Sequence, residues 1–239
     1  MKKNNLKLTR THYSKKVYGS RVSRNKFVVT ELSAYIGIKI LGVGGGGERR
    51  LANHLPKDAE YIEIDMARAP DVIINLEKDM PLPFKDNSFD TVVCTDVLEH
   101  LENFHEVLDE LQRVCAGKII ISLPNSTTIL FNYLFRKKVG QDLHNQGKFS
   151  KFYGLPLSKP DDRHKWFFSY TEADAFFTYY AQKNNINIVE SFPIGLKSAS
   201  IFGWSLRKLT QFIFGKNTML DFFTSAYWCV LDLENQTKT

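Results

Sequence analysis

The chain has 239 residues, of which 43% are hydrophobic and 24% charged, and this composition is typical of one soluble globular domain. No apolar run reaches about 18 residues and the N-terminus is polar and basic, which argues against a transmembrane helix and a hydrophobic signal core. We therefore expect a cytoplasmic protein. Cys94, Cys115 and Cys229 follow no disulfide or ligand spacing, so we expect buried thiols.

The net charge of +6 is concentrated at the N-terminus, where nine lysines and arginines precede the first acid, Glu31, and the rest of the chain carries −3. The nine are Lys2, Lys3, Lys7, Arg10, Lys15, Lys16, Arg21, Arg24 and Lys26. Such an arm binds nucleic acid, anionic lipid or an acidic substrate, or is a solvated tail. We expect a basic arm over residues 1–24, a nucleic-acid contact through residues 1–26 as one alternative, and a single domain over residues 25–239 that opens with a helix over Asn25–Tyr35.

A run of four glycines, Gly44 to Gly47, follows a predicted strand over Ile38–Val43. An amphipathic stretch then continues to near Leu55, so the pattern is strand, turn and helix, in which missing side chains let a ligand approach the backbone. The next predicted strand, Tyr61–Asp65, ends in a carboxylate 19 residues after Gly46. An acid at that distance is placed to hold the two hydroxyls of a ribose, so we predict a nucleoside-type ligand rather than a simple tight turn.

The middle of the chain alternates further strands and helices. Strands are predicted over Val72–Leu76, Phe89–Cys94 and Lys118–Leu123, the second apolar enough to be buried on both faces. A helix before the last of these carries an apolar stripe at spacings of three and four, and Gly117 is expected to stop it. The stripe consists of Phe104, Val107, Leu108, Leu111 and Val114.

The C-terminal part begins with a helix over Ser126–Phe135 and a long polar segment, residues 136–165, that we interpret as a substrate-side insertion or lid. The remaining predicted elements are a helix over Thr171–Gln182 capped by Thr171, a strand over Ile186–Ser191, a helix over Ser200–Phe214 and a strand over Ser225–Leu233. The apolar stripe of the helix over Ser200–Phe214 predicts core packing, with contact to a membrane surface as the alternative. It consists of Phe202, Leu206, Leu209 and Ile213, with Arg207 and Lys208 beside it.

The segment from Pro81 to Leu101 contains LPF-x-DNSFD-x-V followed by VLEHL. It resembles the class I S-adenosylmethionine-dependent methyltransferases. With the glycine run and Asp65, the resemblance covers about residues 38–125, and the segment from His164 to Thr171 is similar to the one that these enzymes often carry before their penultimate helix. The resemblance implies a Rossmann-like doubly wound α/β fold: seven strands, mostly parallel with an antiparallel last strand, and helices on both faces.

The resemblance also implies S-adenosyl-L-methionine as cofactor and a set of binding residues at the ends of the first four strands. The set is Gly42, Gly44, Gly45, Gly46, Asp65, Met66, Asn75, Leu76, Thr95, Asp96 and Val97. Two positions depart from the family pattern. Gly42 stands where an Asp or Glu normally organises the loop near the methionine end of the cofactor, and Glu48 stands where the third glycine is expected.

His100 is the leading candidate for a catalytic base, because it follows the strand at whose end the methyl group is expected, and His164 is the second candidate. A packing histidine is the alternative for His100. We assign no metal ligand, but Asp96, Glu99 and His100 resemble the acid-x-x-Glu-His pattern of metal-dependent O-methyltransferases, and on a helix they would share one face.

We therefore predict a methyltransferase that acts on an oxygen of a small molecule or of a glycan or lipid-linked precursor. The alternative is an RNA ribose methyltransferase that uses the basic arm. Base N-methylation is disfavoured, because Leu123-Pro-Asn125 replaces the motif of enzymes that methylate exocyclic amines. A third interpretation, a cofactor-binding protein without catalysis, rests on Gly42 and Glu48.

Overall fold

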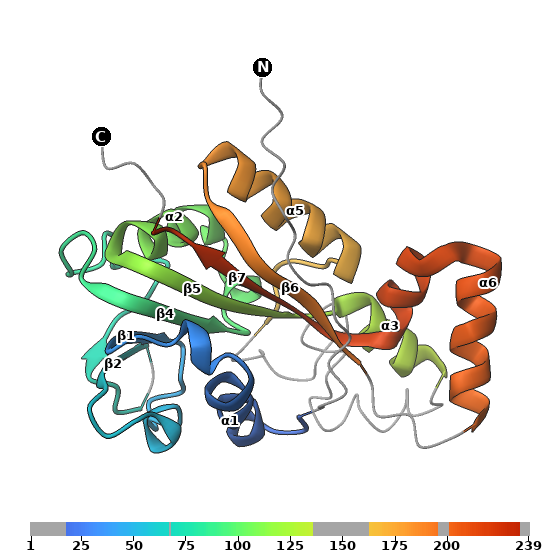
Figure 1. Ribbon diagram of the computed structural model, residues 1–239, viewed down its shortest axis with the longest axis horizontal. Helices are drawn as coiled ribbons and strands as arrows, with labels where there is room; N and C mark the ends of the chain where they lie inside the picture. The colour runs from blue at the N-terminus through green and yellow to red at the C-terminus, as the bar shows by residue number, and fades with distance from the viewer. Residues whose placement is uncertain (1–17, 67, 136–162, 196–200, 235–239) are drawn as a thin grey trace.

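The computed structural model describes residues 18–66, 68–135, 163–195 and 201–234, which form a seven-stranded sheet with helices on both faces (Figure 1). The strands are β1 (Lys39–Val43), β2 (Glu60–Asp65), β3 (Val72–Ile73), β4 (Phe89–Thr95), β5 (Cys115–Pro124), β6 (Asn187–Gly195) and β7 (Thr224–Asp232). Their order is β3-β2-β1-β4-β5-β7-β6, and β7 runs antiparallel to both β5 and β6 while the other pairs are parallel. The predicted fold class is confirmed.

Two hydrophobic clusters cover the two faces of the sheet. The helices are α1 (Arg21–Glu31), α2 (Phe104–Val114), α3 (Ser126–Phe135), α5 (Tyr170–Lys183) and α6 (Ile201–Phe223). Successive residues of a strand point to opposite faces, so Ile40 of β1 packs with Phe27 of α1, while Leu41 lies in the cluster that contains Leu108 of α2 and Phe177 of α5. Figure 1 shows α1 on one side of the sheet and α2 and α5 on the other.

The strand order places a ligand edge at the carboxyl ends of β1 and β4. From β1 the chain winds outward to β2 and β3, and it then returns to β4 on the other side of β1. Open parallel sheets bind ligands at such a reversal, because the loops that leave the two strands diverge there. The glycine run leaves β1 and the segment from Asp96 to His100 leaves β4 at this edge.

Two helices begin at other residues than predicted, because serines that were not predicted as caps accept hydrogen bonds from the amides of the first turn. Helix α1 begins at Arg21 rather than Asn25, since Ser20 and Ser23 form a reciprocal capping box. Helix α5 is capped by Ser169, which forms the same arrangement with Glu172. The predicted cap, Thr171, is wrong: its amide and hydroxyl both donate to Asp221, each at 2.8 Å.

The expected helix after the glycine run is absent, and only a 3₁₀ turn over Ala52–His54 forms there. Gly46, Gly47 and Arg49 have positive φ angles, so the chain does not become helical until a few residues before Pro56. Because a continuous first helix is missing, the loop after β1 offers individual amides rather than a helix N-terminus to a ligand.

The third strand is also shorter than predicted: β3 covers Val72–Ile73 instead of Val72–Leu76.

Gly117 lies inside β5 rather than at the end of α2. The helix ends at Val114, because Cys115 already pairs with Phe89 in the sheet. A Cβ atom on Gly117 would lie 2.5 Å from the carbonyl oxygen of Asp90, so a side chain does not fit where the strands approach. The prediction that Gly117 stops the helix was therefore wrong.

Helix α6 contains a break at Gly215, where φ is +88°. The part before the break agrees with the predicted helix over Ser200–Phe214. Leu209 and Ile213 of its apolar stripe are 52% and 56% exposed, so core packing is not observed for them. No helix in the described ranges is both long enough and apolar enough to cross a bilayer.

The three cysteines are free and buried, as predicted. Burial raises the pKa of the Cys115 thiol to about 12, so it stays protonated at neutral pH.

Candidate functional site

The glycine loop and the acid at the end of β2 meet, as their spacing predicts. The amide of Gly46 donates to Oδ2 of Asp65 at 2.8 Å, and the amide of Gly44 donates to the carbonyl of Ile64 at 2.9 Å. Gly44 and Gly46 have φ angles of +69° and +84°, which favour glycine. Asp65 is partly exposed, so its carboxylate both fixes the loop and faces the space outside the strands.

A buried carboxylate on β2, that of Glu63, lies beside the position on β1 at which the family pattern has an acid. Gly42 and Glu63 are direct partners in the β1–β2 register. Tyr61 donates its hydroxyl to Oε2 of Glu63 at 2.8 Å, and burial, with the Glu63 carboxylate next, raises the pKa of Tyr61. A Cβ atom on Gly45 would lie 2.2 Å from Glu63 Oε2, so this carboxylate packs directly beneath the loop. Glu63, which the sequence analysis missed, supports the loop from the neighbouring strand.

Gly42 is therefore required by its surroundings, and we expect Gly42→Asp, the residue type usual in the family, to destabilise this chain. The new Cβ would lie 2.1 Å from the Tyr61 hydroxyl, and a second carboxylate would approach buried Glu63. Overpacking of this kind costs about 1–3 kcal/mol. Urea unfolding measures the loss. Gly19→Ala is the control, because nothing lies within 4 Å of a Cβ at that position; an equal or more stable Gly42→Asp protein would contradict the arrangement.

The other predicted cofactor residues are distributed around this loop. Val97 is buried against Gly44, whose Cβ would lie 2.3 Å from Val97 Cγ2, and Thr95 is buried at the end of β4. Met66 is largely exposed just after Asp65. The amide of Ile74 donates to the Asp65 carbonyl, so the residues that follow it begin beside that acid. They are Asn75, which accepts from the amide of Glu77, and the buried Leu76.

Asp96 is held in an uncommon backbone conformation by two neighbouring elements. Its φ is +53°, which is unusual for a residue with a side chain. Ser122 of β5 donates its hydroxyl to Oδ1 of Asp96 at 2.7 Å, and Arg24 of α1 forms an ion pair with Oδ2. Neither Ser122 nor the pairing of Arg24 with Asp96 was predicted from the sequence. The ion pair fixes α1 next to the exit of β4.

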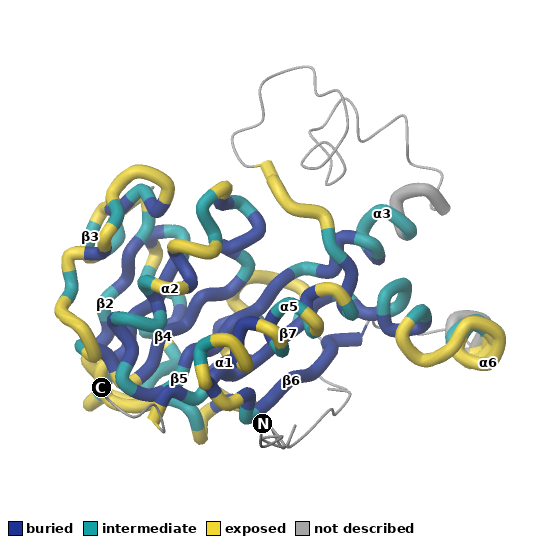
Figure 2. The backbone as a smooth tube through the Cα atoms, turned by 90° about the horizontal axis from the view of Figure 1, so that it is seen from above, coloured by how far each residue is buried: buried dark blue, intermediate teal, exposed yellow. Residues whose placement is uncertain are grey.

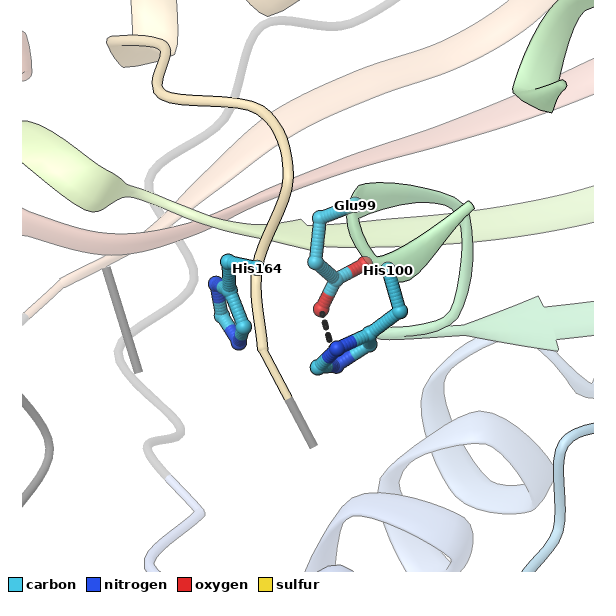
Figure 3. A group of neighbouring side chains, drawn as sticks. All are labelled: Glu99, His100 and His164. Atoms are coloured by element: carbon cyan, nitrogen blue, oxygen red, sulfur yellow. Dashed lines mark ion pairs between the residues drawn. The ribbon is translucent and has the colours of Figure 1, made fainter. Parts of the chain in front are cut away.

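Among the described residues, Asp96 does not join Glu99 and His100 in one group of ligand atoms. After Asp96 the chain makes only a 3₁₀ turn over Leu98–His100, and the shared helical face that would align Asp96 with Glu99 and His100 is missing. His164 takes the place of Asp96. Ligand atoms of Glu99, His100 and His164 all lie within 4.8 Å of one another (Figure 3).

A backbone contact brings His164 to this group from 64 residues away. The amide of Lys165 donates to the carbonyl of Glu99 at 2.8 Å, and the Lys165 ammonium pairs with Glu77, whose pKa it lowers. The rings of His100 and His164 meet edge to face with centroids 4.4 Å apart. The two predicted catalytic histidines are therefore neighbours.

The hydrogen bonds of His100 define which nitrogen faces Glu99. Its Nδ1 lies 3.2 Å from the carbonyl oxygen of Arg163, and because a carbonyl only accepts, this nitrogen carries a proton. Nε2 lies 3.6 Å from Oε1 of Glu99, whose side chain is 1% exposed. A lone pair facing a buried carboxylate is unfavourable unless a proton or a cation lies between them. The group therefore suits a proton transfer or a bound cation.

An apolar cavity of about 190 Å³ opens beside Glu99. Its lining includes Leu98, Phe104, Trp166, Phe168 and Phe176. The Trp166 indole donates to the Leu101 carbonyl at 2.7 Å, which fixes one wall. Residues 1–17 of the basic arm and residues 136–162 of the predicted insertion lie outside the described residues.

Comparisons with known proteins support the fold. Residues 41–121 match the family model described as "Methyltransferase domain". The chain is 41% identical over 56 residues to the uncharacterized protein MJ0638 of Methanocaldococcus jannaschii, and the match spans 23% of this chain and 24% of that protein.

Two solved structures have the same fold. The methyltransferase domain of bacterial CtHen1 has a TM-score of 0.52 at 16% identity, with 88% of this chain and 97% of that chain covered. A SAM-dependent methyltransferase from Archaeoglobus fulgidus has a TM-score of 0.52 at 18% identity, with 90% and 95% covered. Residues 41–121 are thus similar to a methyltransferase domain, and the described residues have the fold of S-adenosylmethionine-dependent methyltransferases.

Proposed function

We propose that this protein transfers a methyl group from S-adenosylmethionine to a hydroxyl oxygen that Glu99, His100 and His164 position. The observation that carries the proposal is the convergence of these three side chains at the carboxyl end of β4, beside the glycine loop. The sulfonium supplies an already activated methyl group, so the protein mainly has to align the acceptor and remove its proton.

The loop after β1 fits the cofactor. A Cβ atom built on Gly46 would lie 3.1 Å from a guanidinium nitrogen of Arg50 and 3.6 Å from one of Arg21. Two cationic groups therefore flank this glycine, and they suit the carboxylate in the methionine part of the cofactor. Asp65 is placed to accept from the ribose hydroxyls. The predicted binding residues thus form a consistent set, with Glu63 supporting the loop in place of an acid at Gly42.

The three-residue group fits a divalent cation better than it fits a lone base. One carboxylate and two imidazoles are common ligands, and the carbonyl of Arg163 favours the His100 tautomer in which Nε2 carries the lone pair that a cation binds. A cation there would lower the pKa of a bound hydroxyl. Without a cation, His100 would act as the general base and Glu99 would stabilise its protonated form.

The cavity beside Glu99 favours a small acceptor with an apolar part, which includes a lipid-linked precursor. Phe104, Trp166 and Phe168 offer aromatic surfaces rather than polar ones. Burying polar sugar hydroxyls against them would cost free energy, so an unmodified glycan fits less well. The proposed acceptor therefore places its hydroxyl at Glu99 and its apolar part in the cavity.

RNA ribose is the second candidate, because two cations at the end of the basic arm lie at this edge of the sheet. Arg24 pairs with Asp96, and Arg21 lies next to Gly46. Clustered cations near the site would attract phosphates. If RNA is the acceptor, we expect activity to fall steeply as the salt concentration rises. If the acceptor is small and neutral, we expect activity to depend little on salt.

Incubation of the full chain with radiolabelled S-adenosylmethionine and separate pools of lipid extract, small molecules, glycans and RNA tests the proposal. We expect label in the lipid or small-molecule pool, loss of labelling with EDTA, and recovery with Mg²⁺ or Mn²⁺. Label confined to RNA would establish the second candidate. A protein that binds the cofactor and labels no pool would support the interpretation without catalysis.

A further inference from the structure

The first part of α6 presents an apolar face to solvent. Phe212 is 87% exposed, Phe214 67%, Ile213 56% and Leu209 52%. Leu209, Phe212 and Ile213 are three and four residues apart, so they share one side of the helix. Four large apolar side chains in one short stretch exceed the scattered exposure that is ordinary for a protein surface.

The chain fixes the base of this helix firmly while its first part stands away from the sheet. After Gly215 the helix continues into buried Met219 and Leu220, and the Asn125 side chain donates to the Asp221 carbonyl at 2.8 Å. Figure 2 shows α6 at the periphery of the molecule with largely exposed residues, and Figure 1 shows it beyond the edge of the other elements. The face is a built feature and not a frayed end.

The charged residues near this face in the sequence are all positive. Between Glu190 and Asp221 the sequence has no acid and four cations: Lys197, Arg207, Lys208 and Lys216. Lys208 and Lys216 are exposed; Lys208 is adjacent to Leu209 in the first part of the helix, and Lys216 follows directly after the break at Gly215. Aromatic and aliphatic side chains framed by cations are the pattern of a helix that lies in the interface of an anionic membrane.

We propose that the apolar face of α6, formed by Leu209, Phe212 and Ile213, docks on the surface of an anionic lipid bilayer. A second copy of this chain fits less well, because the face has cations and no acid near it in the sequence, so a contact between two copies of the face would bring like charges together. Residues 1–17 fit no better, since they too carry cations and no acid.

The proposal is independent of methyl transfer, although it agrees with a lipid-linked acceptor. Helix α6 leads directly into β7, whose Ala226 pairs with Pro124 at the carboxyl end of β5. The candidate site lies at the same end of the sheet. Docking through α6 would therefore hold the site on the membrane side of the molecule.

Flotation of the full chain with vesicles tests the proposal. We expect binding to phosphatidylcholine vesicles that contain about a quarter phosphatidylglycerol, and release in about 0.5 M NaCl. Phe212→Gln combined with Ile213→Gln should weaken binding by about tenfold or more, the value of one apolar side chain that enters the bilayer. Lys208→Gln combined with Lys216→Gln should weaken it by roughly 25-fold, about fivefold for each cation.

The basic arm is the main competing explanation, and the apolar variants separate the two. Ile73→Gln removes a side chain that is 72% exposed on β3 and should leave binding unchanged. Binding that survives Phe212→Gln with Ile213→Gln would overturn the proposal in favour of the arm. Absence of vesicle binding would also overturn it, and a dimer that these substitutions dissociate would identify a second copy as the occupant. Methyl transfer to a water-soluble acceptor should be unaffected.

Discussion

His100→Ala and His164→Ala are each expected to lower turnover by about 10²–10⁴ while the affinity for the cofactor stays nearly unchanged. Both imidazoles converge on Glu99, and removal of either one takes away a group that positions or deprotonates the acceptor hydroxyl. Neither ring supports the glycine loop, so binding of S-adenosylmethionine should persist. Steady-state kinetics with the acceptor found by labelling measures the effect.

The control for this series is His105→Ala. His105 is exposed at the start of α2 and packs on Phe104 with ring centroids 3.8 Å apart, but it does not itself line the cavity. Its removal should leave turnover per folded molecule close to that of the unchanged protein. Normal turnover in a folded His100→Ala protein would instead show that His100 only packs, and attention would then move to His164.

Asp65→Ala is expected to weaken binding of S-adenosylhomocysteine by about 1.5–3 kcal/mol, the scale of a lost charge-assisted hydrogen bond, or roughly 10–150-fold. The substitution removes both the proposed ribose contact and the bond that Asp65 accepts from the Gly46 amide. Asp65→Asn keeps an oxygen for Gly46 and loses the charge, so it should retain more of the affinity. Calorimetric titration measures all three proteins.

Glu60→Ala is the matched control for Asp65, since Glu60 is an exposed acid at the other end of β2. Thermal unfolding of each variant separates loss of binding from loss of fold. Unchanged affinity in a folded Asp65→Ala protein would remove the end of β2 from the cofactor site.

Local patterns were sufficient for the elements whose burial follows a simple period. The stripe from Phe104 to Val114 matches α2 residue by residue, and Ser126–Phe135 is helical as predicted. The spacing between Gly46 and Asp65 also led to a correct spatial prediction, because adjacent parallel strands bring their carboxyl ends to one edge.

The support beneath the loop was not predictable because it depends on register. Gly42 was interpreted as the loss of an acid, whereas the acid is present on the opposite strand as Glu63. A charged residue between Ile62 and Ile64 was the available signal, since such a position in a buried strand is unusual without a partner. Only the pairing of β1 with β2 shows what that partner is.

The composition of the histidine group depended on a contact between distant segments. The helix assumed over Asp96–His100 gave the wrong third member, because Asp96 adopts a positive φ and turns to Ser122 and Arg24. His164 joins the group through the bond between the Lys165 amide and the Glu99 carbonyl, which no local pattern encodes. The exposure of the apolar stripe of α6 was likewise not predictable, since the spacing of apolar residues does not show whether another element packs on them.

Binding of Mn²⁺, followed by its electron paramagnetic resonance signal, tests the central claim most directly. We predict one bound ion per chain, with binding weakened by about a hundredfold or more in Glu99→Gln and in His164→Ala, since even loss of an outer partner costs about 10–100-fold. Glu106→Gln, at an exposed acid in the first turn of α2, should bind Mn²⁺ normally. Equal binding by Glu99→Gln and the unchanged protein would contradict a cation held by Glu99, His100 and His164.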